Sequence, residues 1–90
     1  AIHTPGHTPG HLSVAIDDGE TVLFLAGDTS YTEQLMLAAT PDGVSPDPGQ
    51  ARQTLGRIRQ LTAQRRTVYL PTHDPEAPTR LERGQVTPQP

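Results

Sequence analysis

The alternation of hydrophobic and polar positions near the start of the chain predicts a β-hairpin. In residues 12–17, LSVAID, large apolar side chains at every second position favour a half-buried strand. Residues 17–20, DDGE, supply the turn, because Gly19 can adopt a positive φ. Residues 22–26, VLFLA, are apolar on both faces, which predicts a strand that is covered on both sides and ends at Gly27-Asp28.

Apolar positions at helical spacing predict one long helix in the second half of the chain. Asp47 is expected to be its N-cap and Pro48 its first residue, and the helix is expected to run to about Gln64. The side chains expected in its buried stripe are Ala51, Leu55, Ile58 and either Leu61 or Thr62.

Shorter elements complete the predicted layout. Residues 30–39 favour either a short helical turn or an ordered loop, and residues 40–49 form a connection rich in proline. A short strand is expected within TVYLPTHD, residues 67–74, followed by a turn of helix near residues 79–82. Residues 83–90 are expected to form a loose tail. The order of elements predicts an α/β fold with separate helix and sheet layers.

Composition excludes several classes of function. The 90 residues include no cysteine, which rules out disulfides and thiolate zinc sites. The net charge is −3, and five of the seven arginines fall between Arg52 and Arg66, within the predicted helix or directly after it. This arrangement favours a solvated helix face over a nucleic-acid surface. No segment resembles a signal peptide or membrane span, so we expect neither a membrane nor a nucleic-acid partner, and a cytoplasmic location.

The repeat HTPGHTPGH at residues 3–11 places a histidine at every fourth position. This spacing would align His3, His7 and His11 on one helical face, as in helical zinc motifs. Two prolines and two glycines within the repeat exclude that helix. A tight loop remains, in which the backbone approaches its neighbours closely and one imidazole can face a site.

Three further residues follow predicted strands and are candidates for chemistry. Asp28 ends the apolar strand, where ligands bind in α/β sheets, although it is equally consistent with a helix N-cap. His73 follows the last strand and is either a hydrogen-bonded loop residue or a metal ligand. Imidazole and carboxylate together are the ligand set of zinc and similar divalent ions. Tyr31 either packs as a half-buried side chain or donates a hydrogen bond to a developing oxyanion.

Three motifs, TPGHTPGH, FLAGDTSYT and LPTHDP, resemble the C-terminal half of a metallo-β-lactamase-fold hydrolase. The run Asp28-Thr29-Ser30-Tyr31-Thr32 is similar to that of the N-acyl homoserine lactonases. The resemblance implies that residues 1–90 form the C-terminal part of a single domain. They would then be the incomplete half of an αβ/βα sandwich, with one apolar face of the sheet left bare.

The resemblance also implies a role for each motif residue. His7 would bind one metal ion, Asp28 would bridge two ions, and His73 would bind the second. Tyr31 would contact the carbonyl or leaving group of the substrate, and His11 would support the loop. The implied cofactors are two divalent ions, zinc before iron, manganese or cobalt, and the implied reaction is attack of a metal-bound hydroxide on a lactone or other small ester.

One departure from the family pattern limits what the isolated chain is expected to do. The His-x-His-x-Asp-His segment of the family's N-terminal half does not occur in these residues. We therefore expect the 90 residues alone neither to bind metal tightly nor to hydrolyse lactones, and to require the N-terminal half of the same domain.

Two alternatives to the lactonase remain open at this point. The first is a glyoxalase II-like thioesterase or another hydrolase of the same fold. The second is a non-catalytic, truncated binding module. A His-x-His-x-Asp-His segment upstream in the parent reading frame would favour the enzyme, whereas a start codon next to Ala1 would favour the module.

Overall fold

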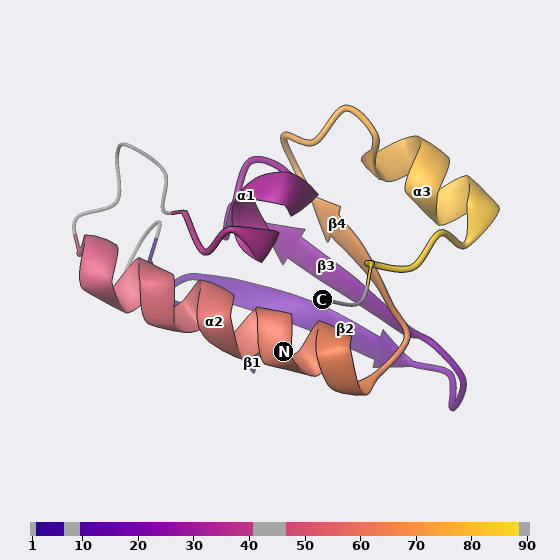
Figure 1. Cartoon of the computed structure of the whole chain (residues 1–90), viewed down its shortest axis with the longest axis horizontal. Helices are drawn as coiled ribbons and strands as arrows, with labels where there is room; N and C mark the ends of the chain where they lie inside the picture. Colours follow the sequence, from indigo (N-terminus) through magenta and orange to yellow (C-terminus); the bar gives the residue numbers. More distant parts are fainter. Residues whose placement is uncertain (1, 7–9, 41–46, 89–90) are drawn as a thin grey trace.

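The computed structural model describes residues 2–6, 10–40 and 47–88, which form one mixed sheet with helices packed against it (Figure 1). The strands lie in the order in which they occur along the chain: β1 (Ile2–His3), β2 (Leu12–Asp17), β3 (Val22–Gly27) and β4 (Thr67–Pro71). Neighbours from β1 to β3 are antiparallel, whereas β3 and β4 are parallel. The helices are α1 (Glu33–Leu37), α2 (Pro48–Gln64) and α3 (Ala77–Arg83). The predicted α/β class with helix and sheet layers is confirmed.

The β2–β3 hairpin forms where the alternation of the sequence predicts it. The carboxylate of Asp18 accepts hydrogen bonds from the backbone N–H groups of Glu20 and Thr21, and Gly19 has a φ of 95°. These contacts close the turn and set the register, in which Val14 faces Leu25. The turn chemistry of the sequence therefore fixes which residues of the two strands share a face.

Helix α2 has the boundaries that its capping residues predict. The carboxylate of Asp47 accepts a hydrogen bond from Gln50 N–H at 3.0 Å, and proline occupies the first helical position. The buried side chains of α2 are Ala51, Thr54, Leu55, Ile58 and Thr62. Of the two open alternatives, Thr62 is thus the buried residue, and Leu61 lies at the margin of the core.

Among the described residues, the core occupies one face of the sheet. It is formed by buried side chains from two strands and two helices: Phe24, Ala26, Met36, Leu55, Ile58 and Tyr69. Because α1 and α2 both lie on this face (Figure 1), the other face of β2 and β3 lacks a covering layer among the described residues. Apolar residues on that face are 41–57% exposed: Leu12, Val14, Ile16 and Leu25. The expectation that residues 22–26 are covered on both sides is therefore wrong within this chain, whereas the expected bare apolar face is present.

The end of the chain is better anchored than its composition predicts. Gly84, with a φ of 61°, ends α3 and turns the chain back toward the sheet. Thr87 is 1% exposed, and its N–H donates a hydrogen bond to the carbonyl oxygen of Thr67 at 2.7 Å. Within the segment expected to be loose, residues 83–90, the backbone of β4 thus binds Thr87. None of the described helices combines the length and apolar character that a bilayer crossing requires.

A bidentate ion pair joins the β2–β3 hairpin to the C-terminal end of α2. This pair predicts how the stability of the fold changes at low pH. Two guanidinium nitrogens of Arg65 lie 2.8 and 2.9 Å from the carboxylate oxygens of Asp17. Arg65, followed by the N–H of Gly19, lowers the pKa of Asp17 from 3.8 to about 2. A lowered native pKa means that the pair stabilises the fold above the unfolded pKa, and that this contribution disappears as the pH falls through about 2.

Carboxyl-carbon NMR titration measures the pKa of Asp17 directly. We expect Arg65→Gln to return this pKa toward 3.8, whereas the neighbouring exposed variant Arg66→Gln should leave it near 2. A wild-type midpoint near 3.8 would show that the ion pair does not form in solution.

Candidate active site

Two candidate residues meet because the parallel strands β3 and β4 end at the same edge of the sheet. Asp28 follows β3 and His73 follows β4, and His73 Nε2 lies 3.2 Å from Asp28 Oδ1. The ring of Tyr31 meets the His73 ring edge-on, with centroids 5.2 Å apart and an interplanar angle of 69°. The structure thus brings together Asp28, Tyr31 and His73, while His7 lies outside the described residues. The catalytic and metal-binding roles of all four remain predictions.

The side chain of His11 forms a hydrogen bond with the backbone of Asp28. His11 Nε2 accepts a hydrogen bond from Asp28 N–H at 3.1 Å, so its proton is on Nδ1, which donates to Thr4 Oγ1 at 3.0 Å. The Thr4 hydroxyl then donates to Ser13 Oγ at 2.8 Å, and Ser13 donates to the carbonyl oxygen of Ala26 at 3.4 Å. Each hydroxyl donates one hydrogen bond, because this series of hydrogen bonds begins at the N–H donor of Asp28 and ends at the carbonyl acceptor of Ala26. His11 is therefore placed to support Asp28, whereas His3 lies in β1.

Gly27 makes the contact between His11 and Asp28 possible. Its φ is 58°, and a Cβ at this position would lie 2.9 Å from His11 Nε2. Gly27→Ala therefore adds a left-handed backbone penalty of about 1–2 kcal/mol and pushes the imidazole away. By contrast, Gly56→Ala in α2 meets no atom within 4 Å, and we expect it to raise stability by about 0.5–1 kcal/mol. Urea unfolding of both variants measures these changes, and a Gly27→Ala variant as stable as wild type would contradict the packing described.

Tyr69 braces the segment between Asp28 and Tyr31. Its hydroxyl lies 2.8 Å from both Thr29 Oγ1 and Ser30 Oγ, and Ser30 Oγ donates to the carbonyl oxygen of Thr32. The Tyr69 hydroxyl therefore donates to Ser30 and accepts from Thr29. Burial raises the pKa of Tyr69 above its usual value, although both hydroxyl contacts oppose the shift, so the phenol stays protonated. Residues Asp28 to Tyr31 are thus tied to the middle of β4.

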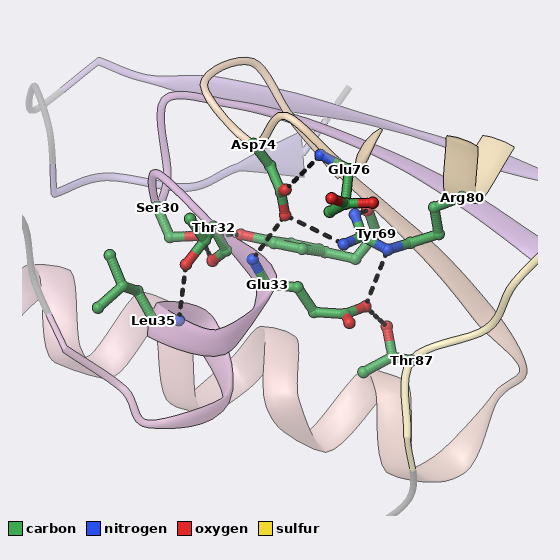
Figure 2. Close-up of polar contacts among 9 residues, drawn as sticks. All are labelled: Ser30, Thr32, Glu33, Leu35, Tyr69, Asp74, Glu76, Arg80 and Thr87. Atoms are coloured by element: carbon green, nitrogen blue, oxygen red, sulfur yellow. Dashed lines mark hydrogen bonds and ion pairs between the residues drawn. The ribbon is translucent and has the colours of Figure 1, made fainter. Parts of the chain in front are cut away.

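A buried ionic cluster is centred on Asp74, the residue that follows His73, and Figure 2 draws its members. Asp74 is 4% exposed, and its carboxylate accepts hydrogen bonds from the N–H groups of Glu33 and Glu76 and from Arg80. Burial alone would raise the pKa of Asp74, but these bonds outweigh it and hold the pKa below its usual range. Arg80 also lies 3.5 Å from the carboxylate of Glu33, which accepts a hydrogen bond from Thr87.

Tyr69, Asp74 and Arg80 were not among the candidate residues predicted from the sequence. The only local signal was the position of Asp74, directly after His73 in the THDP motif. Tyr69 lies within an apolar strand, and Arg80 lies among prolines and charged residues that predict an exposed surface. Their partners come from segments about 40 residues away, such as Ser30 and Glu33, so their function depends on the folded arrangement.

The donor chemistry of the site fits part of a divalent metal centre. Asp28 and His73 present a carboxylate oxygen and an imidazole nitrogen toward each other, which is a ligand combination used by zinc. Among residues 2–6, 10–40 and 47–88, no group of three or more potential ligand side chains gathers at one place. Two donors are fewer than the three or four protein ligands of known zinc sites. The described residues therefore supply part of a centre and would need further ligands.

Comparison with known proteins agrees with this architecture. The sequence model of the Metallo-beta-lactamase superfamily matches residues 1–73. The fold is similar to the crystal structure of the hydrolase AbOPH in the beta lactamase superfamily, with a TM-score of 0.68, 25% identity and 84% of this chain covered. The chain spans 27% of the length of that hydrolase. No curated protein gives a significant match. The chain belongs to the metallo-beta-lactamase superfamily.

Proposed function

We propose that this chain is the C-terminal part of a metal-dependent hydrolase that opens a lactone ring. The superfamily is hydrolytic and generally binds divalent metal ions. The observation that carries the proposal is the approach of His73 Nε2 to within 3.2 Å of Asp28 Oδ1, with the ring of Tyr31 beside it. A carboxylate, an imidazole and a phenol at the ends of two parallel strands can supply metal ligands and a hydrogen-bond donor to one substrate.

His7, Asp28 and His73 are the residues of this chain that would hold metal. Bound divalent ions supply activation of water and polarisation of the ester carbonyl. Tyr31, which is 37% exposed, donates its phenol proton in a hydrogen bond to the oxygen that gains negative charge as the ester bond breaks. His11 keeps the Asp28 backbone in place, so that its carboxylate faces His73.

The remaining ligands are proposed to come from the N-terminal half of the same domain. Two observations support this proposal: the chain spans 27% of the related hydrolase, and one face of its sheet is apolar and exposed. A second sheet packed on Leu12, Val14, Ile16 and Leu25 would bury this face in a sandwich. We call the chain joined to that half the complete domain.

Tyr31→Phe tests the proposed reaction in the complete domain. Loss of one hydrogen bond to a developing oxyanion lowers kcat by about 10²–10³. We expect this loss with an N-acyl homoserine lactone as substrate, with the zinc content unchanged, because the phenol is not a metal ligand in this proposal. Unchanged lactone hydrolysis in Tyr31→Phe would contradict the role of Tyr31. Hydrolysis of a thioester but not of a lactone by the wild-type domain would instead identify a thioesterase.

A further inference from the structure

Asp74 joins the two loops that carry the candidate site. Its Oδ2 accepts a hydrogen bond from Glu33 N–H at 3.0 Å, and its Oδ1 accepts one from Glu76 N–H at 2.9 Å. Glu33 is the first residue of α1, two residues after Tyr31, whereas Asp74 directly follows His73. One carboxylate therefore links the start of α1, just after Tyr31, to the residue that follows His73, and Figure 2 shows its contact with Glu33 N–H.

Arg80 fixes the direction in which the Asp74 carboxylate points. Its Nη2 donates to Asp74 Oδ2 at 3.1 Å, and its Nη1 donates to the carbonyl oxygen of Tyr69 at 2.7 Å. The planar guanidinium thus holds Asp74 at a fixed place relative to β4. Both side chains are almost fully buried, with 7% of Arg80 and 2% of Asp74 exposed, so water competes little for these bonds.

His73, on the exposed side of the site, depends on the support that Asp74 and Arg80 give to its backbone. The His73 side chain is 57% exposed, so its direction depends on how its backbone is held. Metal ligands must converge to within a few tenths of an ångström, and a small shift of one loop would separate the donors. On the Asp28 side, His11 holds the Asp28 N–H, and Asp74 provides the corresponding hold between the two loops.

We propose that Asp74, oriented by Arg80, is a positioning residue that sets the spacing of Asp28, Tyr31 and His73. The inference rests on the proposed function of that site. The Asp74 side chain lies in the buried cluster, where three donors occupy its two oxygens. Its effect on metal binding and catalysis therefore acts through the positions of its neighbours.

NMR of the complete domain, stripped of metal, tests the geometry of the two loops. The probe is the nuclear Overhauser contact between the Tyr31 and His73 rings, whose centroids lie 5.2 Å apart. We expect this contact in wild type and in Glu76→Gln, which removes an exposed carboxylate two residues from Asp74. We expect its loss in Asp74→Ala and its weakening in Asp74→Asn, which keeps the shape and one oxygen acceptor and is the milder variant for folding. The methyl signals of Leu55 and of the core around it should stay dispersed in every variant, which would show that the variants remain folded.

Zinc affinity of the complete domain provides the second measurement. Residues that orient metal ligands typically change affinity 10- to 100-fold, so Asp74→Ala should weaken zinc binding by at least about tenfold and Glu76→Gln should not. A folded Asp74→Ala variant that retains the ring contact and wild-type zinc affinity would overturn the proposal. If the wild-type domain binds no zinc, the proposed function fails, and the ring contact alone decides whether Asp74 positions the loops.

Discussion

Replacing Arg80 by methionine is expected to lower the free energy of unfolding by about 3–5 kcal/mol. The substitution keeps an extended side chain but leaves the carboxylates of Asp74 and Glu33 without their cation. These carboxylates are 2% and 12% exposed, so water cannot replace the lost partner at little cost. Small domains are stable by about 5–15 kcal/mol in total, and the variant should therefore be close to unfolding.

Arg83→Met is the matched control for this prediction, because Arg83 lies in the same helix and is exposed. Its effect in urea unfolding should stay within about 0.5 kcal/mol. Removing one of the orphaned charges as well, in Asp74→Asn/Arg80→Met, should recover part of the loss, which a double-mutant cycle measures. An Arg80→Met variant that loses less than about 1 kcal/mol would show that the cluster does not hold the fold together.

Asp28→Asn is expected to remove both metal binding and hydrolysis from the complete domain while leaving the fold intact. The amide keeps the size of the side chain, and the backbone N–H of Asp28 still donates to His11. The carboxylate that faces His73 at 3.2 Å is lost, however, and neutral amides are poor ligands for zinc. We expect zinc affinity to fall by more than about a hundredfold, since even residues that only orient ligands cost 10- to 100-fold.

Asp47→Asn is a matched control for Asp28→Asn. Asp47 is the exposed N-cap of α2, and asparagine caps helices as well as aspartate does. The control should keep wild-type zinc content by metal analysis and wild-type activity. If Asp28→Asn also kept both, Asp28 would not be the bridging ligand that the family resemblance implies.

The elements with local signals were predictable from the sequence. Helix α2 has the predicted bounds. Its start is defined by Asp47, which caps the helix through a hydrogen bond, and by the fixed φ of Pro48. The hairpin follows from alternation and from Gly19. The family resemblance implied that Asp28 and His73 share one metal centre, and the parallel pairing of β3 with β4 brings these strand ends together.

The buried supports of the site could not be predicted in this way. Glu33, Asp74 and Arg80 each resemble a solvated surface charge in the sequence, and only tertiary packing buries them together. Thr87 likewise lies in a segment whose composition predicts a loose tail, yet it pairs with β4. The expected cover on both sides of residues 22–26 was wrong for a related reason. An apolar strand indicates that both its faces are buried, but it does not identify which segment covers each face.

Calorimetric titration with zinc tests the central claim, that this chain carries part of a metal site completed by the rest of its domain. The isolated 90-residue chain should show no submicromolar binding, because its described residues bring together fewer than three ligands. The complete domain should bind two zinc ions with submicromolar affinity. Submicromolar binding by the isolated chain, or none by the complete domain, would contradict the claim.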